Sequence, residues 1–167
     1  MTIQSLKNIV INGFIVLGLS FGLMVSATAD YSFEEIEAGA KRGDSIAQNI
    51  LGFYYHEGKG VRQDYAKAFY WHQKSANQGD SDGQFYVGHY YISGEGVRQD
   101  YSKGLEWLKK SANQNNTSAQ ALIGLLYAYG KGVRQNKTTA KEWYGKACDN
   151  GDQNGCDDYK ILNEQGY

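Results

Sequence analysis

Residues 47–82 read AQNILGFYYHEGKGVRQDYAKAFYWHQKSANQGDSD, and residues 83–118 follow as GQFYVGHYYISGEGVRQDYSKGLEWLKKSANQNNTS. Eighteen of the 36 aligned positions are identical, and residues 119–154 form a third copy that keeps several of the glycines in step. Self-similarity at a fixed period of tens of residues indicates stacked copies of one supersecondary unit. The sequence therefore predicts a repeat protein with a 36-residue period.

Each copy begins with a segment that has the periodicity of a helix, which we name helix A. Small and apolar residues recur at spacings of three and four from Ala47 to Tyr55, so one face of this segment is expected to be buried. Gly58 and Gly60 follow directly, and glycine readily adopts the positive φ that ends a helix and turns the chain. In the first copy, helix A is predicted over residues 45–57.

The second half of each copy predicts a second helix, which we name helix B. Asp64 precedes it and is placed to accept hydrogen bonds from the free amide groups of its first turn. Gly79, or Asn115 in the second copy, is placed to end it in a left-handed conformation. Helix B of the first copy is expected over residues 65–78. One hairpin cannot bury both of its apolar faces alone, so we predict an all-α solenoid of stacked helix-turn-helix units.

The first 29 residues have the pattern of a signal peptide. Lys7 precedes an apolar run over residues 9–25, and small residues close the segment as Ala27-x-Ala29, which suits signal peptidase. Cleavage after Ala29 would start the mature chain at Asp30. The apolar run is also about as long as the shortest membrane spans, so a retained anchor is the alternative.

The remainder of the chain, residues 30–167, is expected to form one repeat domain. The segment before the first copy aligns with the end of a helix B, and the segment after the third copy aligns with the start of a helix A. Each end of the stack therefore carries a half-unit. The expected parts are the N-terminal half-unit 30–44, the repeats 47–82, 83–118 and 119–154, and the C-terminal half-unit 155–167.

The recurring pattern A-x-x-x-L-G-x-x-Y-x-x-G-x-G-V-x-x-D-x-x-x-A-x-x-W-x-x-x-A-A-x-x-G closely resembles the Sel1-like repeat family, which is related to tetratricopeptide repeats. The most specific part is L-G-x-x-Y-x-x-G-x-G-V starting at Leu51, which returns with aliphatic replacements in both later copies. Tetratricopeptide repeats typically have a proline after helix B, whereas this chain has none. The resemblance covers about residues 33–162 and implies a right-handed α/α solenoid.

In the related tetratricopeptide repeats, helix A lines a concave groove, and the resemblance implies the same surface here. The helix A positions that would face it are those at which the copies differ most, while the packing positions agree. They offer an apolar strip with polar contacts, which suits a peptide or an amphipathic helix. For Phe53 and Phe85, the alternative is a place in the core between units. The candidate partner-binding residues are Asn49, Phe53, His56, Phe85, His89, Ile92 and Leu125.

Cys148 and Cys156 form the only possible cysteine pair in the chain. Cys148 is expected at the end of a helix B and Cys156 at the start of the following helix A, and an oxidising compartment would be expected to join them. We expect the bridge to staple the terminal half-unit and to have no redox or metal-binding role. The spacing resembles that of the cysteine-rich secreted branch of the Sel1-like family. That branch includes proteins described as penicillin-binding or weakly β-lactam-hydrolysing, which is the alternative function that the resemblance implies.

Charge and residue placement argue against several other functions. The net charge is −1 at pH 7 and basic residues alternate with acidic ones, so no basic stripe offers a surface for nucleic acid. The histidines His56, His72 and His89 fall at three different repeat positions, so we expect no metal site. No cofactor motif or catalytic nucleophile is indicated. The recurring Val-Arg-Gln-Asp that starts at Val61 leaves open an exposed arginine ladder for an acidic partner.

Together these patterns predict a secreted or periplasmic scaffold without catalytic machinery, which binds a protein or peptide through the concave helix A surface. No stable membrane insertion is expected after the signal is cleaved. The resemblance adds that Sel1-like proteins are associated with the assembly of multiprotein complexes, and secreted bacterial members with envelope signalling or contact with a host.

Overall fold

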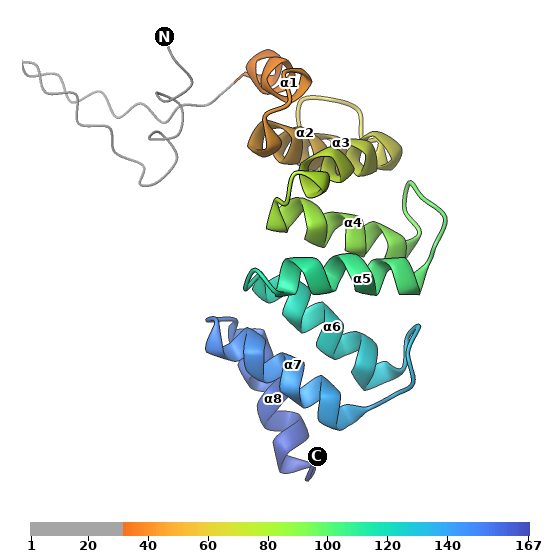
Figure 1. Cartoon of the computed structure of the whole chain (residues 1–167), viewed down its shortest axis with the longest axis vertical. Helices are drawn as coiled ribbons and strands as arrows, with labels where there is room; N and C mark the ends of the chain where they lie inside the picture. The colour runs from red at the N-terminus through yellow and green to blue at the C-terminus, as the bar shows by residue number, and fades with distance from the viewer. Residues whose placement is uncertain (1–31) are drawn as a thin grey trace, which may run out of the picture. The chain divides into compact units, whose positions relative to one another are not determined.

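The computed structural model describes residues 32–167, which form eight α-helices and no strand (Figure 1). The expected signal peptide and the start of the mature chain at Asp30 lie outside the described residues. Within residues 32–167, no helix is both long enough and apolar enough to cross a membrane. The helices are α1 (Phe33–Lys41), α2 (Ser45–Glu57), α3 (Tyr65–Asn77), α4 (Ser81–Ser93), α5 (Tyr101–Ala112), α6 (Thr117–Tyr129), α7 (Lys137–Asp149) and α8 (Gln153–Glu164).

The helices alternate as the repeat predicts. α2, α4 and α6 are helix A of the three copies, α3, α5 and α7 are helix B, and α1 and α8 are the half-units at the two ends. Each helix packs against the helices before and after it in the sequence. Figure 1 shows the long loops after α4 and after α6 on the same side of the stack. The predicted all-α solenoid is therefore confirmed.

The predicted helix ends are formed by the residues singled out for them. Asp64 caps α3 by accepting a hydrogen bond from the Lys67 backbone amide at 2.9 Å. Asn136, which replaces aspartate in the third copy, caps α7 through the Thr139 amide at 3.0 Å. Asn115 follows α5 with a φ of 64°, a left-handed conformation that is uncommon for a residue other than glycine. Short-range capping chemistry thus sets both the start and the end of the repeated helices.

The core of each unit is built from the same repeat positions. Leu51, Val87 and Ile123 occupy one position of helix A and are each fully buried. Tyr55 and Trp71 lie partly buried against the first core cluster, which combines residues of α1 and α2. Burial stabilises an aliphatic side chain of this size by about 1.5–3 kcal/mol. The framework residues expected from the sequence therefore hold neighbouring units together.

A glycine follows each of these aliphatic residues and lets helix B approach closely. His72, Leu108 and Tyr144 share the helix B position that packs on it. A Cβ atom on Gly124 would lie 2.7 Å from two ring carbons of Tyr144, and one on Gly52 would lie 2.8 Å from the His72 ring. Such separations are well below van der Waals contact, so any side chain there would push helix B away. The repeated glycine therefore sets the helix spacing inside each unit.

A buried glutamine ties each unit to the preceding helix B. Gln120 is 2% exposed, and its Nε2 donates to the Ala112 carbonyl at 3.1 Å. Its Oε1 accepts a hydrogen bond from Asn150 Nδ2 at 3.1 Å. Gln48 and Gln84 make the equivalent contacts in the earlier copies. A buried amide that loses its hydrogen-bond partners destabilises the fold, so these repeated glutamine contacts favour one register between units.

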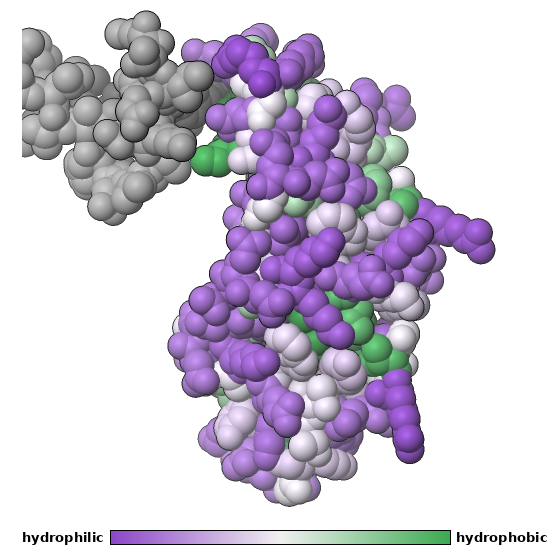
Figure 2. Space-filling model, viewed as in Figure 1, coloured by the Kyte–Doolittle hydropathy of each residue, from purple (hydrophilic) through white to green (hydrophobic). Residues whose placement is uncertain are grey.

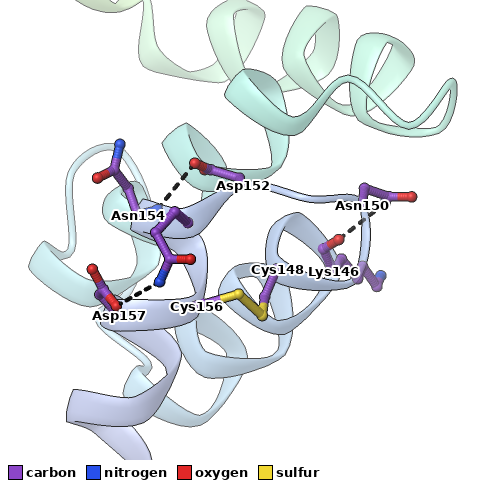
Figure 3. Close-up of a disulfide and its surroundings, with 8 residues drawn as sticks. Lys146, Cys148, Asn150, Asp152, Asn154, Cys156 and Asp157 are labelled. Atoms are coloured by element: carbon purple, nitrogen blue, oxygen red, sulfur yellow. Dashed lines mark hydrogen bonds between the residues drawn. A yellow bond between two sulfur atoms is a disulfide. The ribbon is translucent and has the colours of Figure 1, made fainter.

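The predicted disulfide joins the last two helices. Cys148 in the last turn of α7 is bonded to Cys156 in the first turn of α8, with Cα atoms 4.5 Å apart (Figure 3). Asp152 starts α8 by accepting a hydrogen bond from the Asn154 amide at 3.2 Å. α8 packs mainly against α7, so the bridge ties the end of the stack to its main neighbour.

Candidate functional site

The helix A side of the stack holds a hollow of about 310 Å³ that reaches from α2 across α4 to the start of α6. Its lining combines aromatic, aliphatic, amide and carboxylate side chains. Three of the seven predicted partner-binding residues contribute to it. The lining residues are Asn49, Ile50, Phe53, Asp82, Phe85, Tyr86, Asn116 and Ser118.

The apolar part of this surface is partly open to solvent. Phe53 is 38% exposed, whereas Phe85 is half-buried and also packs against the core cluster that α5 and α6 share. Leu125 on α6 is 39% exposed. Figure 2 shows that the face of the described stack turned toward the viewer is mostly hydrophilic, with small apolar patches. Phe53 thus offers apolar contact area to a partner, while Phe85 contributes to the core and to the hollow together.

One acidic residue, Asp82, lines the hollow, and the charges of two others act on its lining. Asp82, in the first turn of α4, accepts a hydrogen bond from Asn116 Nδ2 at 2.8 Å. Burial, and then the charge of Asp80, raises the pKa of the Asp82 carboxyl above its usual value, and the Asn116 bond opposes this rise. The pKa of Tyr86 is raised by burial and then by the charges of Asp82 and Glu57. Charges of the same sign therefore act on two lining residues.

Three histidines gather around two tyrosines of α4. His56 Nδ1 lies 2.8 Å from the Tyr90 hydroxyl, and the His72 ring stacks on the Tyr86 ring with centroids 4.2 Å apart. The ring centroid of His89 lies 6.1 Å from that of Tyr90. Their different repeat positions gave no indication that these histidines share neighbours. Within the part of the chain that the structure describes, no group of three or more histidine, cysteine or acidic residues is arranged to hold a metal ion.

Burial favours the neutral form of two of these imidazoles. It lowers the pKa of His72 to about 3, and the charge of His56 acts in the same direction. Burial is also the main cause that lowers the pKa of His89. His72 Nδ1 lies 2.9 Å from Asn49 Oδ1, and its Nε2 has no hydrogen-bond partner among residues 32–167. The cluster therefore acts by packing, and it positions Asn49 and Tyr86 in the lining of the hollow.

The remaining predicted residues do not line the hollow. His56 and His89 belong to the histidine–tyrosine cluster, and Leu125 lies farther along the stack on α6. Ile92 packs against the core cluster, where a Cβ atom on Gly104 would lie 2.5 Å from its Cδ1. Only part of the predicted set is thus brought together in one place.

Sequence reasoning missed the polar rim of the hollow. Asp82 lies in the first turn of α4 and Asn116 is the cap of α6, and these places were interpreted only as helix boundaries. The sequence did contain an indication for Asp82, because the equivalent position of helix A holds Ile46 in α2 and Ser118 in α6. A carboxylate at one copy of a repeated position is not required by the common framework.

The stacked hairpins with their shared packing positions define a helical-repeat scaffold, and comparison with known families specifies it. The Sel1 repeat model matches residues 45–80, 81–116 and 117–152. The chain belongs to the Sel1 repeat family.

Several solved structures are similar. The protective antigen c5321 of uropathogenic Escherichia coli, described as having an SLR fold, is 33% identical with a TM-score of 0.76, over 80% of this chain and 28% of that one. A Sel1 repeat protein from Oxalobacter formigenes is 32% identical with a TM-score of 0.69, over 75% of this chain and 51% of that one. Helicobacter pylori cysteine rich protein B shares the fold at 20% identity and a TM-score of 0.59, over 75% of this chain and 96% of that one.

A plant relative matches a shorter segment. The ERAD-associated E3 ubiquitin-protein ligase component HRD3B of Arabidopsis thaliana is 40% identical over 47 residues, which are 28% of this chain and 8% of that protein. The chain thus spans less than a tenth of this relative, and 28% and 51% of the Escherichia coli and Oxalobacter formigenes chains.

Proposed function

We propose that this chain is an exported scaffold, periplasmic or secreted, that binds a protein or peptide through its helix A surface. The observation that carries the proposal is the hollow lined by Asn49, Phe53 and Phe85, positions at which the copies differ while the packing positions agree. Sel1 repeats mediate protein–protein interactions, and such scaffolds are typical of adaptors. One relative is named as a component of a ubiquitin ligase, which supports a role in an assembly.

Export is supported by the signal-peptide pattern and by the cysteine pair. Structural disulfides persist in oxidising compartments and are rare in the cytosol, which fits the bond between Cys148 and Cys156. N-terminal sequencing of the exported protein should therefore start at Asp30. Recovery in the membrane fraction of a chain that still carries residues 1–29 would favour the retained anchor.

Penicillin binding or weak β-lactamase activity stays the alternative that the cysteine-rich branch implies. The likeness to cysteine rich protein B of Helicobacter pylori is one of fold, at 20% identity. Sel1 repeat proteins are generally non-catalytic scaffolds. We expect the purified chain to leave a chromogenic β-lactam unhydrolysed, and measurable hydrolysis would support the alternative.

Simultaneous replacement of Phe53, Phe85 and Leu125 by alanine tests the scaffold function. The full chain, immobilised, is incubated with an extract of exported proteins, and the captured proteins are quantified by mass spectrometry. We expect the variant to lose the captured partner and to keep its helical content, because partly exposed side chains contribute more to contact than to folding. The melting temperature should fall modestly, since Phe85 also packs against the core cluster of α5 and α6. Capture equal to that of the unchanged chain, or a collapse of the fold, would each contradict the proposed surface.

A matched control separates this surface from general stickiness. The control replaces three exposed apolar side chains of α3 and α8, Tyr70, Tyr159 and Ile161, which are 52%, 39% and 50% exposed. These residues do not line the hollow. Capture by the control variant should equal that of the unchanged chain.

A further inference from the structure

The rim of the hollow carries a carboxylate that the rest of the described chain leaves without a cation. Asp82 accepts a hydrogen bond from the neutral amide of Asn116 at 2.8 Å. Among residues 32–167, no lysine or arginine forms an ion pair with it. Glu57, the second carboxylate whose charge acts on Tyr86, lies 3.5 Å from the imidazole of His56. The hollow is therefore complementary in charge to a cation from outside the chain.

Helix capping does not account for the carboxylate. The cap of α4 is Asp80, whose side chain already accepts a hydrogen bond from the Gly83 amide at 2.6 Å. Ile46 in α2 and Ser118 in α6 stand at the position of Asp82, each as the second residue of its helix. The helix dipole favours a carboxylate in a first turn. Asp82 is an exposed residue, and partial burial of its carboxyl is the main cause that raises its pKa above the usual value.

The aromatic walls narrow the choice of cation. Phe53 from α2 and Tyr86 from α4 both line the hollow that Asp82 borders. A guanidinium group is planar, stacks on aromatic rings and donates two parallel hydrogen bonds to one carboxylate. An ammonium group is a strongly hydrated point charge and gains less from such walls. The volume of about 310 Å³ is at the lower end of the range for ligand clefts, which suits one long side chain.

We propose that the hollow between α2 and α4 receives an arginine side chain from a basic peptide segment of the partner, with Asp82 as its counter-ion. This inference rests on the proposed peptide-binding function. The guanidinium lies against the rings of Phe53 and Tyr86. The side-chain oxygens of Asn49 and Asn116 already lie 2.9 Å from His72 Nδ1 and 3.0 Å from the Ala119 amide, and each accepts a second hydrogen bond from the guanidinium through its remaining lone pair. Arginine at one position is thus the main determinant of peptide choice.

Pools of fluorescein-labelled dodecapeptides test this choice with the full chain. The pools are random except for one central residue, which is arginine, lysine, citrulline or glutamate, and binding is followed by fluorescence polarisation. Citrulline matches arginine in shape but has no charge. We expect the arginine pool to bind about tenfold or more tightly than the citrulline and glutamate pools, since a hydrogen-bonded charge pair is at stake. Lysine should fall between them.

Two substitutions assign the preference to one carboxylate. Asp82→Asn and Asp82→Ser should each reduce binding of the arginine pool to the level of the citrulline pool and leave the citrulline pool unchanged. Ser118 shows that a serine at this position is compatible with the fold. Asp157→Asn removes an exposed carboxylate of α8 outside the hollow and should change nothing.

The outcomes separate the two proposals. Binding of all pools with no preference for arginine, or a preference that survives both Asp82 substitutions, would overturn the arginine site and leave peptide binding intact. Binding of no pool would contradict peptide recognition by this surface and the arginine site with it. Loss of the preference in the Asp82 variants, together with retained citrulline binding, is the result that supports it.

Discussion

The glycine that follows the buried aliphatic residue of helix A sets helix spacing, and Gly124→Ala in α6 tests this most directly. Considered as a helix residue alone, alanine should stabilise α6 by about 1 kcal/mol relative to glycine. The added Cβ atom would however lie 2.7 Å from Cδ1 and from Cε1 of Tyr144, which is 5% exposed. A buried ring cannot move aside as a flexible side chain can. Overpacking of this kind costs typically 1–3 kcal/mol, so after the gain in helix propensity we expect a net loss of up to about 2 kcal/mol.

In a chain that already carries Tyr144→Ala, we expect Gly124→Ala to change stability in the opposite direction. Tyr144→Ala should itself destabilise the chain by about 3–5 kcal/mol, because it removes a large core side chain. It also removes the ring that blocks residue 124, so Gly124→Ala in this background should stabilise by about 1 kcal/mol. The difference between the two backgrounds equals the overpacking cost, about 1–3 kcal/mol, and is the coupling energy of a double-mutant cycle.

Urea unfolding followed by circular dichroism measures these free energies, and Gly145→Ala in α7 is the matched control. A Cβ atom on Gly145 would lie no closer than 3.3 Å to a neighbouring side chain, that of the partly exposed Tyr159. The control should therefore show the gain from helix propensity alone. If Gly124→Ala stabilises the unchanged chain as much as the control does, the glycine is not needed for helix spacing and the reasoning fails.

Two further predictions concern the disulfide and a buried histidine. Replacement of Cys148 and Cys156 by serine should cost about 2–3 kcal/mol and raise hydrogen exchange selectively in α8; uniform exchange along the chain would contradict a stapling role. The pKa of His72 is lowered from 6.5 to about 3 in the folded state, so its contribution to stability is complete above pH 6.5 and is lost as pH falls toward 3, by up to about 1.4 kcal/mol per pH unit. Urea unfolding at a series of pH values should show this slope in the unchanged chain. His72→Leu, which copies Leu108, should flatten it, and an unchanged slope would refute the assignment.

The parts of the fold that sequence alone predicts depend on local chemistry. Asp64 and Gly58 act within one or two turns, and the structure places both at the helix ends where they were expected. Because the pattern recurs every 36 residues, a hairpin predicted for one copy is predicted for every copy, and the whole stack follows. Aligning the copies with one another shows which positions keep the same type of residue, and these positions identified Leu51 and its counterparts as the core.

Polar contacts between helices were harder to predict because the residue types that make them gave no indication of burial. Gln48, Gln84 and Gln120 recur in every copy, yet glutamine is usually exposed, and these residues received no role. Their Nε2 atoms donate to the carbonyls of Ala40, Ala76 and Ala112 in the preceding helix B, which links successive units. Their Oε1 atoms accept hydrogen bonds from the end of helix B of their own unit. The histidine–tyrosine cluster was missed for the opposite reason. His72 and His56 each occur in one copy only, so no repetition marked the place where α2, α3 and α4 bring them together.

Differences between copies have two distinct physical origins, and the sequence does not separate them. Ile92 differs from its counterpart His56, but Gly104 differs from its counterpart Ala68 in the same copy, and the two changes meet in space. The larger side chain on α4 is matched by a smaller one on α5, so this departure is a compensated packing change. Asp82 also departs from the pattern together with a neighbour, since Asn116 stands where the other copies have Asp44 and Asp80 and donates a hydrogen bond to the Asp82 carboxylate. That amide supplies a hydrogen bond but no positive charge, so the charge of Asp82 is left without a cation. In a repeat protein, a carboxylate without a cation on a hollowed surface is therefore the stronger indication of a binding site.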